Sequence, residues 1–136
     1  GNNYTHEQRL EGFRDAMGSR FTGAQIISSE SYEEEAASIL EERGGRTAFF
    51  CSGDIYAMDI MKYLKARGKR APKDYGIMGF DDIELLEYLS PRLSTIYNSV
   101  EEVAKRAVEL LYDEMEGREI AMETYERYRL VQGETL

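Results

Sequence analysis

The sequence predicts an α/β fold: a three-layer, open and mostly parallel sheet with helices on both faces. Two observations support this prediction. Strand-like and helix-like patterns alternate along the chain. In addition, residues 47–51 and 76–80 form short, nearly all-apolar runs, which are typical of strands covered on both faces. At 136 residues, 42% of them apolar, the chain is long enough for one domain with its own core.

The expected helices are recognised by their capping residues and by apolar side chains at helical spacing. Thr5 with Gln8 and Ser31 with Glu34 form capping-box patterns, and Gly44 and Gly45 close the second helix. The expected helices span residues 5–17, 31–43, 54–67, 83–88 and 99–117.

The expected strands lie between these helices, at residues 24–27, 47–51, 76–80, 93–97 and 125–131. Because the sequence opens with a helix, the strand that should precede it in an alternating order is absent. The last helix, 99–117, has a wide apolar stripe. We expect this stripe to pack back onto the sheet of the same chain or to pair with a second copy.

The charge argues against nucleic-acid binding by this segment, because a net charge of −9 repels a polyanion. Its one dense basic cluster, 65–70, lies at an expected helix C-terminus, where cations favour the helix dipole. The single cysteine, Cys51, lies in an apolar run and is expected to be a buried, unreactive thiol. A single histidine, His6, offers no metal site, and we expect neither a metal nor another cofactor. The sequence shows no bilayer-length apolar stretch and no secretory leader, so a cytoplasmic location is expected.

Small and acidic residues follow two of the expected strands. Ser52, Gly53 and Asp54 follow one strand, and Asp81 and Asp82 follow the next. Ligands of open parallel sheets sit beyond the carboxyl ends of the strands, so a small-molecule site is predicted there. A carboxylate can accept hydrogen bonds from vicinal hydroxyls, as in sugars, or it can cap the next helix. Both roles are filled if Asp81 faces the ligand cleft and Asp82 caps the helix that follows.

Three further candidates each have a plainer alternative. Asp54 either contacts a ligand or only satisfies the start of its helix. Gly53 has no side chain, but its backbone can approach a ligand closely. Arg9, early in the first helix, either grips a carboxylate or ligand oxygens, or is simply solvated.

The sequence offers no catalytic constellation, so we expect no enzyme activity. No nucleophile, base and orienting group come together. Asp81 and Asp82 are adjacent in an extended segment and would point to opposite faces, which disfavours an acid–base pair. An enzyme using this pair is the least favoured of the functions considered.

Four stretches, 8–17, 47–58, 68–82 and 93–96, match in order and spacing a known family. The chain resembles the effector-binding region of the lactose/galactose-repressor family of bacterial transcription regulators, which shares its fold with periplasmic sugar-binding proteins. The resemblance implies that residues 1–136 are a single α/β domain, the second lobe of a periplasmic-binding-protein-like fold. It also implies that the DNA-binding headpiece and most of the first lobe lie outside this sequence. Helix 99–117 corresponds to one that normally packs in the first lobe.

The resemblance also implies site residues. In the family, the residues matching Arg9 and Asp81 hold the effector. Gly53 stands where the family usually has an asparagine that often contacts the ligand. Asn98 stands near the usual hinge glutamine and can make the same kinds of hydrogen bond. With Asp54, these residues form the expected ligand-binding set.

The expected function is therefore the ligand-sensing part of a bacterial transcription repressor. It would bind a sugar-like or nucleoside-like effector that shifts the DNA affinity of the full-length protein. Operator DNA would be bound only through the headpiece, and the family forms homodimers, with the helix near Ile55 and the turn 83–88 as candidate contacts. The alternative is a solute-binding protein of a transport system on the same fold.

Overall fold

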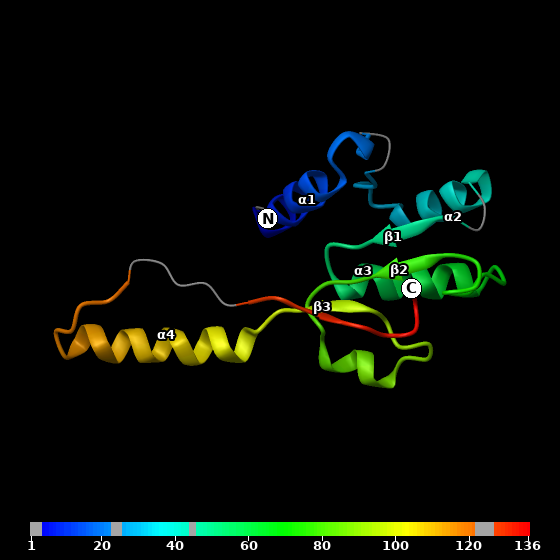
Figure 1. Cartoon of the computed structure of the whole chain (residues 1–136). Coiled ribbons are helices and arrows are strands. Elements are labelled where there is room, and N and C mark those ends of the chain that lie inside the picture. The colour runs from blue at the N-terminus through cyan, green and yellow to red at the C-terminus, as the bar shows by residue number, and fades with distance from the viewer. Residues whose placement is uncertain (1–3, 23–25, 44–45, 122–126) are drawn as a thin grey trace.

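A computed structural model describes residues 4–22, 26–43, 46–121 and 127–136 of the chain. Helices and strands alternate as predicted, and the α/β fold class is confirmed (Figure 1). The elements are α1 (Tyr4–Met17), η1 (Gly18–Arg20), α2 (Tyr32–Arg43), β1 (Ala48–Phe50), α3 (Asp54–Lys65), β2 (Gly76–Met78), η3 (Glu84–Tyr88), β3 (Thr95–Tyr97), α4 (Val100–Met115) and β4 (Arg129–Val131).

The strands form two two-stranded sheets, β1-β2 and β3-β4, which isolated bridges join side by side. β1 and β2 pair in parallel, with Phe49 opposite Ile77. Parallel bridges from Met78 to Ser94 and from Asp81 to Tyr97 join β2 to the β3 segment. β4 pairs antiparallel to β3 and is the exception. The carboxyl ends of β1, β2 and β3 therefore share one edge.

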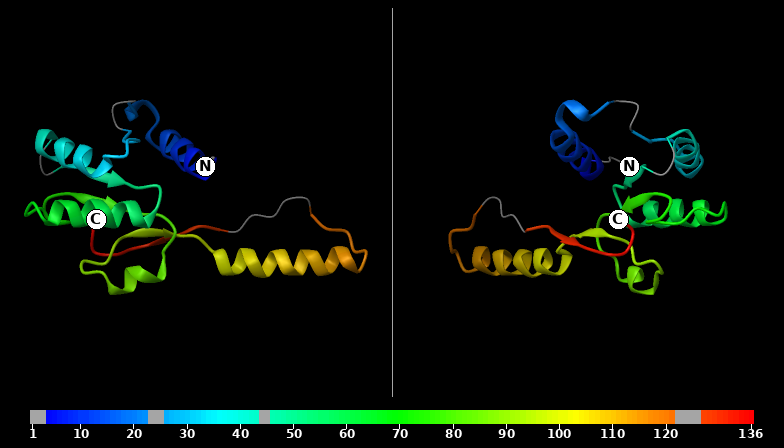
Figure 2. Two further views of the ribbon diagram at one scale, coloured as in Figure 1. Left: turned by 180° about the vertical axis from the view of Figure 1, so that it is seen from behind. Right: turned by 45° about the vertical axis from the view of Figure 1, so that its right-hand side comes forward.

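Helices lie on both faces of β1. Because successive strand side chains point to opposite faces, Phe49 and Phe50 pack against different helices. Phe49 is buried in the core beneath α2 and α3, where it meets Tyr75 at a ring distance of 6.0 Å. Phe50 stacks on Phe13 of α1 on the other face, at 5.4 Å. Figure 2 shows α1 apart from the α2–α3 pair in both views. Packing on both faces thus holds β1 in place beside β2, and the carboxyl ends of both strands stay at the same edge.

Some expected elements differ from the structure in detail. The helix expected at 83–88 is a 3-10 helix, and its first flanking residue, Ile83, makes no side-chain cap. Asp82 therefore does not cap it as predicted. The Ile83 N–H is instead bound by the Asp54 carboxylate, at 3.0 Å. The glycines 44–45, the first half of strand 24–27 and the first residues of strand 125–131 lie outside the described residues. The described half, Ile26 and Ile27, does not form a strand.

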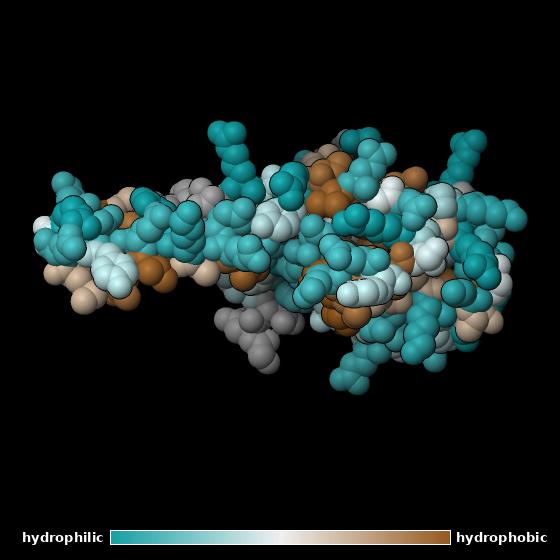
Figure 3. All heavy atoms as spheres, turned by 90° about the horizontal axis from the view of Figure 1, so that it is seen from below, coloured by the Kyte–Doolittle hydropathy of each residue, from teal (hydrophilic) through white to brown (hydrophobic). Residues whose placement is uncertain are grey.

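α4 projects away from the rest of the molecule, and none of its residues is buried (Figures 1 and 2). Its packing back onto the sheet of the same chain was therefore predicted wrongly. The cause is the path of the chain, because β3 leads outward into α4 at Asn98. Pairing with a second copy stays a prediction. Figure 3 shows apolar side chains along the exposed arm, and those exposed by half or more are Val100, Val103, Val108, Leu111, Tyr112 and Met115.

Among the described residues, no helix is both long enough and apolar enough to span a bilayer.

Candidate functional site

The candidate site lies where three strand ends meet. Ser52 comes shortly after β1, Asp81 follows β2, and Asn98 follows β3 directly. Because parallel strands end at one edge, these three residues come together although they are far apart in the sequence. Arg9 reaches them from α1, so the structure brings together four of the five predicted site residues: Arg9, Gly53, Asp81 and Asn98.

Arg9 is paired rather than solvated. Its Nη2 donates to Asp81 Oδ1 at 2.9 Å, and its Nη1 donates to the Ser52 carbonyl oxygen. The guanidinium also lies over the Phe80 ring, 3.8 Å from the ring centre. Only 12% of the Arg9 side chain is exposed. These contacts hold its planar fork of donors in one orientation at the strand ends.

Asp81 is held in an unusual backbone conformation. Its φ of +117° lies outside the range that side-chain-bearing residues usually adopt, and such strain is typically found at functional positions. Its N–H donates to the Ile96 carbonyl and its own carbonyl accepts from the Asn98 N–H, so both of its backbone groups are bonded to the β3 segment. The carboxylate is thereby aimed at Arg9.

The Asp81 carboxylate has one oxygen left for a ligand. Oδ1 accepts from Arg9 and, at 3.3 Å, from Asn98 Nδ2. No described residue donates a hydrogen bond to Oδ2, and a third of the side chain is exposed. Oδ2 can accept a hydroxyl proton while unused guanidinium N–H groups of Arg9 donate to the hydroxyl oxygens. This pairing suits a polyhydroxylated molecule.

Gly53 borders this free oxygen. A Cβ at position 53 would lie 3.8 Å from Asp81 Oδ2 and 3.4 Å from Tyr56 Cδ2. Gly53 itself is buried, and it precedes α3 without a side-chain cap. A side chain at this position would therefore lie beside Asp81 Oδ2, and glycine adds no group there.

Asp54 follows neither of its two expected roles. Its side chain is buried, with 1% of the residue exposed. Oδ1 accepts from the Thr95 hydroxyl at 2.5 Å, and Oδ2 accepts from the Ile83 N–H at 3.0 Å. The residue therefore ties the start of α3 to β3 and to η3, and its carboxylate has no surface to offer a ligand.

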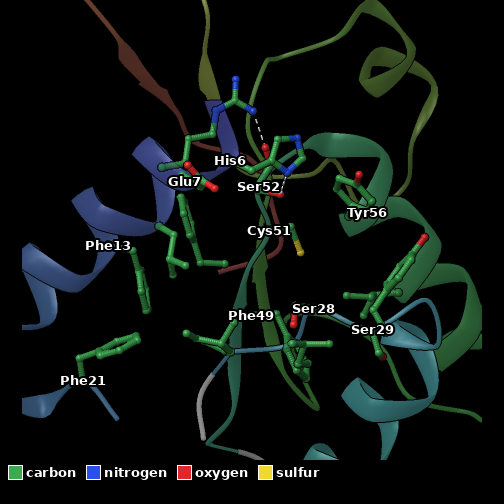
Figure 4. A pocket seen from close by; sticks show the side chains of 18 of the residues that line it. His6, Glu7, Phe13, Phe21, Ser28, Ser29, Phe49, Cys51, Ser52 and Tyr56 are labelled. Atoms are coloured by element: carbon green, nitrogen blue, oxygen red, sulfur yellow. Dashed lines mark hydrogen bonds between the residues drawn. The ribbon is translucent and has the colours of Figure 1, made fainter. Parts of the chain in front are cut away.

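Sequence reasoning missed His6. Its Nδ1 lies 2.9 Å from Ser52 Oγ, and its ring meets the edge of Tyr56 at 5.9 Å (Figure 4). The available signal was its position three residues before Arg9, which places both side chains on one face of a helix. From the sequence, His6 was considered only as a metal ligand.

A groove with a volume of about 670 Å³ begins beside this site. His6, Arg9 and Ser52 line one end of it, and it continues along β1 between α1 and residues 26–30 (Figure 4). Asp81 and Asn98 do not line this groove. The free carboxylate oxygen and the groove are therefore neighbouring but separate features.

Cys51 lies beside the site but is chemically quiet. It is buried, and burial, followed by the nearby charge of Asp54, raises the pKa of its thiol to about 12. A thiol with that pKa is almost fully protonated near neutral pH. The expectation of a buried, unreactive thiol agrees with this environment.

Comparisons with known proteins agree with this geometry. The family model for the periplasmic binding protein-like domain matches residues 1–136. The chain is 31% identical over 129 residues to the transcriptional repressor PurR of Vibrio cholerae, which covers 90% of the chain and 38% of PurR. It is 37% identical over 112 residues to the ribose operon repressor of Haemophilus influenzae, covering 77% of the chain and 34% of that repressor. The chain thus spans little more than a third of the length of these curated relatives.

The fold is likewise similar to solved structures. A LacI family transcriptional regulator from Enterococcus faecium with bound ribose superposes with a TM-score of 0.79 at 26% identity, over 96% of this chain and 51% of that one. A LacI family regulator from Arthrobacter sp. FB24 in complex with lactose has a TM-score of 0.67 at 34% identity, over 76% of this chain and 40% of that one.

Proposed function

Because the chain belongs to the periplasmic binding protein-like domain family, within its lactose-repressor branch, we propose that it is the effector-sensing lobe of a transcription repressor. Its ligand is a small sugar-like or nucleoside-like effector held at the strand ends by Arg9, Asp81 and Asn98. The observation that carries the proposal is the fixed Arg9–Asp81 pair, which leaves Asp81 Oδ2 open.

The names of the relatives favour a regulator over a transport protein. The curated relatives are the transcriptional repressor PurR and the ribose operon repressor, and two similar regulators hold ribose and lactose. A carboxylate facing a guanidinium accepts and donates hydrogen bonds to the hydroxyls that sugars and nucleosides share. The ligand class proposed for this chain follows from that chemistry.

The effector acts by differential affinity. A ligand shifts the balance between two conformations only by as much as it binds one of them better. In the full-length protein, effector held at this edge contacts a second lobe as well, and closure of the lobes changes the affinity for operator DNA. DNA is bound by the headpiece and not by this acidic segment.

The full-length protein acts as a homodimer in this proposal. The expected contact surface, on α3 and η3, carries apolar side chains that the structure leaves exposed: Ile55, Tyr56, Leu85 and Tyr88. Exposed apolar groups gathered on one surface are typical of protein contacts.

Calorimetry on the full-length protein tests the proposal. Ribose, galactose, lactose and adenosine are titrated into the wild type and into Asp81→Asn, which keeps the shape but removes the charge that faces Arg9. At least one ligand should bind, and Asp81→Asn should weaken it by about thirtyfold or more, since a charge-assisted hydrogen bond contributes about 2 kcal/mol.

The matched control is Glu11→Gln, which neutralises an exposed carboxylate on α1 outside the site. It should bind as the wild type does. An operator sequence is first found by in vitro selection. Fluorescence anisotropy then measures the affinity of the full-length protein for this operator, with and without the ligand. Equal affinity of Asp81→Asn and wild type for the ligand would refute the site, and unchanged operator affinity would refute the regulatory role.

A further inference from the structure

A buried ring lies beneath the guanidinium of Arg9. Phe80 is 7% exposed, yet it is not part of the main hydrophobic cluster of the described residues. One of its contacts is with Arg9, whose Cζ lies 3.8 Å from the ring centre. Another is with Tyr128, whose ring centre lies 5.4 Å away, with an angle of 66° between the ring planes. Phe80 therefore joins the candidate site to the chain just ahead of β4.

The next residue, Arg129, makes a second contact of this kind. Arg129 is the first residue of β4, and its guanidinium lies 4.6 Å from the ring centre of Tyr97, which it faces in the β3–β4 register. Tyr97 directly precedes Asn98 in the chain. In the same way, Phe80 directly precedes Asp81. Two consecutive residues where β4 begins thus touch two rings, and each ring adjoins a side chain of the candidate site.

We propose that Phe80 and Tyr128 are positioning residues, which together hold the Arg9 guanidinium in the orientation that binds the effector. Both act through Arg9 and not on the ligand itself. A guanidinium is attracted to the face of an aromatic ring, and its planar shape makes this stacking directional. Tyr128 acts on the Phe80 ring in turn, because edge-to-face ring pairs have a preferred geometry. The inference rests on the proposed effector site.

The hydrogen bonds of Arg9 leave one motion of its guanidinium open. Nη1 donates to the Ser52 carbonyl oxygen and Nη2 donates to Asp81. Both bonds are made at the outer end of the guanidinium, so its plane can still tilt about the line that joins the two nitrogens. The Phe80 ring lies against one face of the plane and opposes this tilt. The ring contact therefore supplies a restraint that the hydrogen bonds do not.

The contact makes effector binding and the position of β4 interdependent. β3 leads out to α4, and β4 pairs with β3 on the way back (Figure 1). A shift of Tyr128 relative to Phe80 changes how firmly Arg9 is held. Because coupling free energies are reciprocal, effector binding favours the position of β4 in which the ring contact is made. In the full-length protein, β4 is thereby a route by which the effector acts on the chain beyond this lobe.

NMR of the Arg9 side chain in the 136-residue chain tests the positioning without any ligand. The measured quantity is the rate at which the guanidinium rotates about its Nε–Cζ bond. Tyr128 is 64% exposed, so its substitution leaves the core intact. Tyr128→Ser removes the ring and should raise the rotation rate by about threefold or more, whereas Tyr128→Phe keeps the ring and should leave the rate unchanged. Phe80→Leu should raise the rate further, and Tyr128→Ser decides the outcome if that variant does not fold.

The matched control is Leu130→Ala, which truncates an apolar side chain of similar exposure, 61%, on the same strand. Its Arg9 guanidinium should rotate as in the wild type. An unchanged rate in Tyr128→Ser, or an equal rise in Leu130→Ala, would overturn the proposal.

Calorimetry on the full-length protein, with D-ribose and adenosine as probes, measures the effect on binding. Tyr128→Ser should weaken the binding of whichever probe the wild type binds by about threefold, and Tyr128→Phe should bind as the wild type does. Binding that Asp81→Asn weakens but Tyr128→Ser does not would overturn the proposal and leave the effector site standing. If neither probe binds, the effector site fails for these ligands, and the rotation rate alone decides the role of Tyr128.

Discussion

Arg9 and Asp81 are 72 positions apart in the sequence, yet one short ion pair joins them at the end of the sheet. The pair is partly shielded by the Phe80 ring, which restricts the guanidinium to one orientation. A fixed donor fork beside a free carboxylate oxygen loses little conformational entropy when a ligand binds. At the residue scale, the site is thus organised before any ligand arrives.

Gly53→Asn should tighten sugar binding about fivefold, because an amide at this position lies next to Asp81 Oδ2 and adds one hydrogen bond of about 1 kcal/mol. Calorimetry of the full-length protein with its tightest sugar measures the change. Gly53→Ala supplies the Cβ without the amide and should leave the affinity close to that of wild type. If the alanine variant binds as tightly as the asparagine variant, the amide is not the cause.

Cys51 should lower the free energy of unfolding at alkaline pH. Burial raises the pKa of its thiol to about 12, from an ordinary value near 9. The neutral thiol therefore stabilises the fold fully below pH 9, and this contribution is lost as the pH rises towards 12. The free energy of unfolding, from urea titrations, should fall by up to about 1.4 kcal/mol per pH unit from this group.

Cys51→Ala serves as the comparison for this pH effect. It should decline less steeply between pH 9 and 12. The remaining decline comes from tyrosines such as Tyr75, whose pKa burial raises to about 12. Identical slopes for the variant and the wild type would contradict a buried thiol.

At the scale of elements, α3 is anchored and α4 is not. The Asp54 carboxylate connects the first residue of α3 to Thr95 and Ile83, and α3 also packs on α2, where the Tyr32 hydroxyl donates to Asp59 at 2.7 Å. α4 has no buried residue. An amphipathic helix gains most of its stability from packing its apolar face, so α4 is the element that most needs a partner.

Leu111→Glu should reduce self-association of the 136-residue chain. Leu111 is 58% exposed in the middle of the apolar stripe of α4, and a charge there opposes burial against another copy. Sedimentation velocity over a hundredfold range of concentration measures the effect. Lys105→Gln changes the net charge by the same amount on the polar face and should associate as the wild type does. A wild-type chain that stays monomeric throughout would contradict the prediction.

At the scale of the whole molecule, the sequence predicted what depends on local patterning. Apolar runs and helical spacing located most helices and strands, and the strand ends placed Asp81 beside Arg9. The capping patterns predicted less well, because Thr5 lies inside α1 and Ser99 makes no side-chain cap. The sequence did not predict what depends on distant partners. The role of Asp54 depends on Thr95 and Ile83, which lie 41 and 29 positions away. The outward path of α4 depends on the way β3 leaves the sheet, which no local pattern encodes.

The most direct test of the strand-end site is a crystal structure of the full-length protein with its tightest sugar or nucleoside. We predict that neighbouring ligand hydroxyls lie within about 3 Å of Asp81 Oδ2 and of the Arg9 guanidinium. A ligand bound elsewhere, with the Arg9–Asp81 pair untouched, would contradict this account.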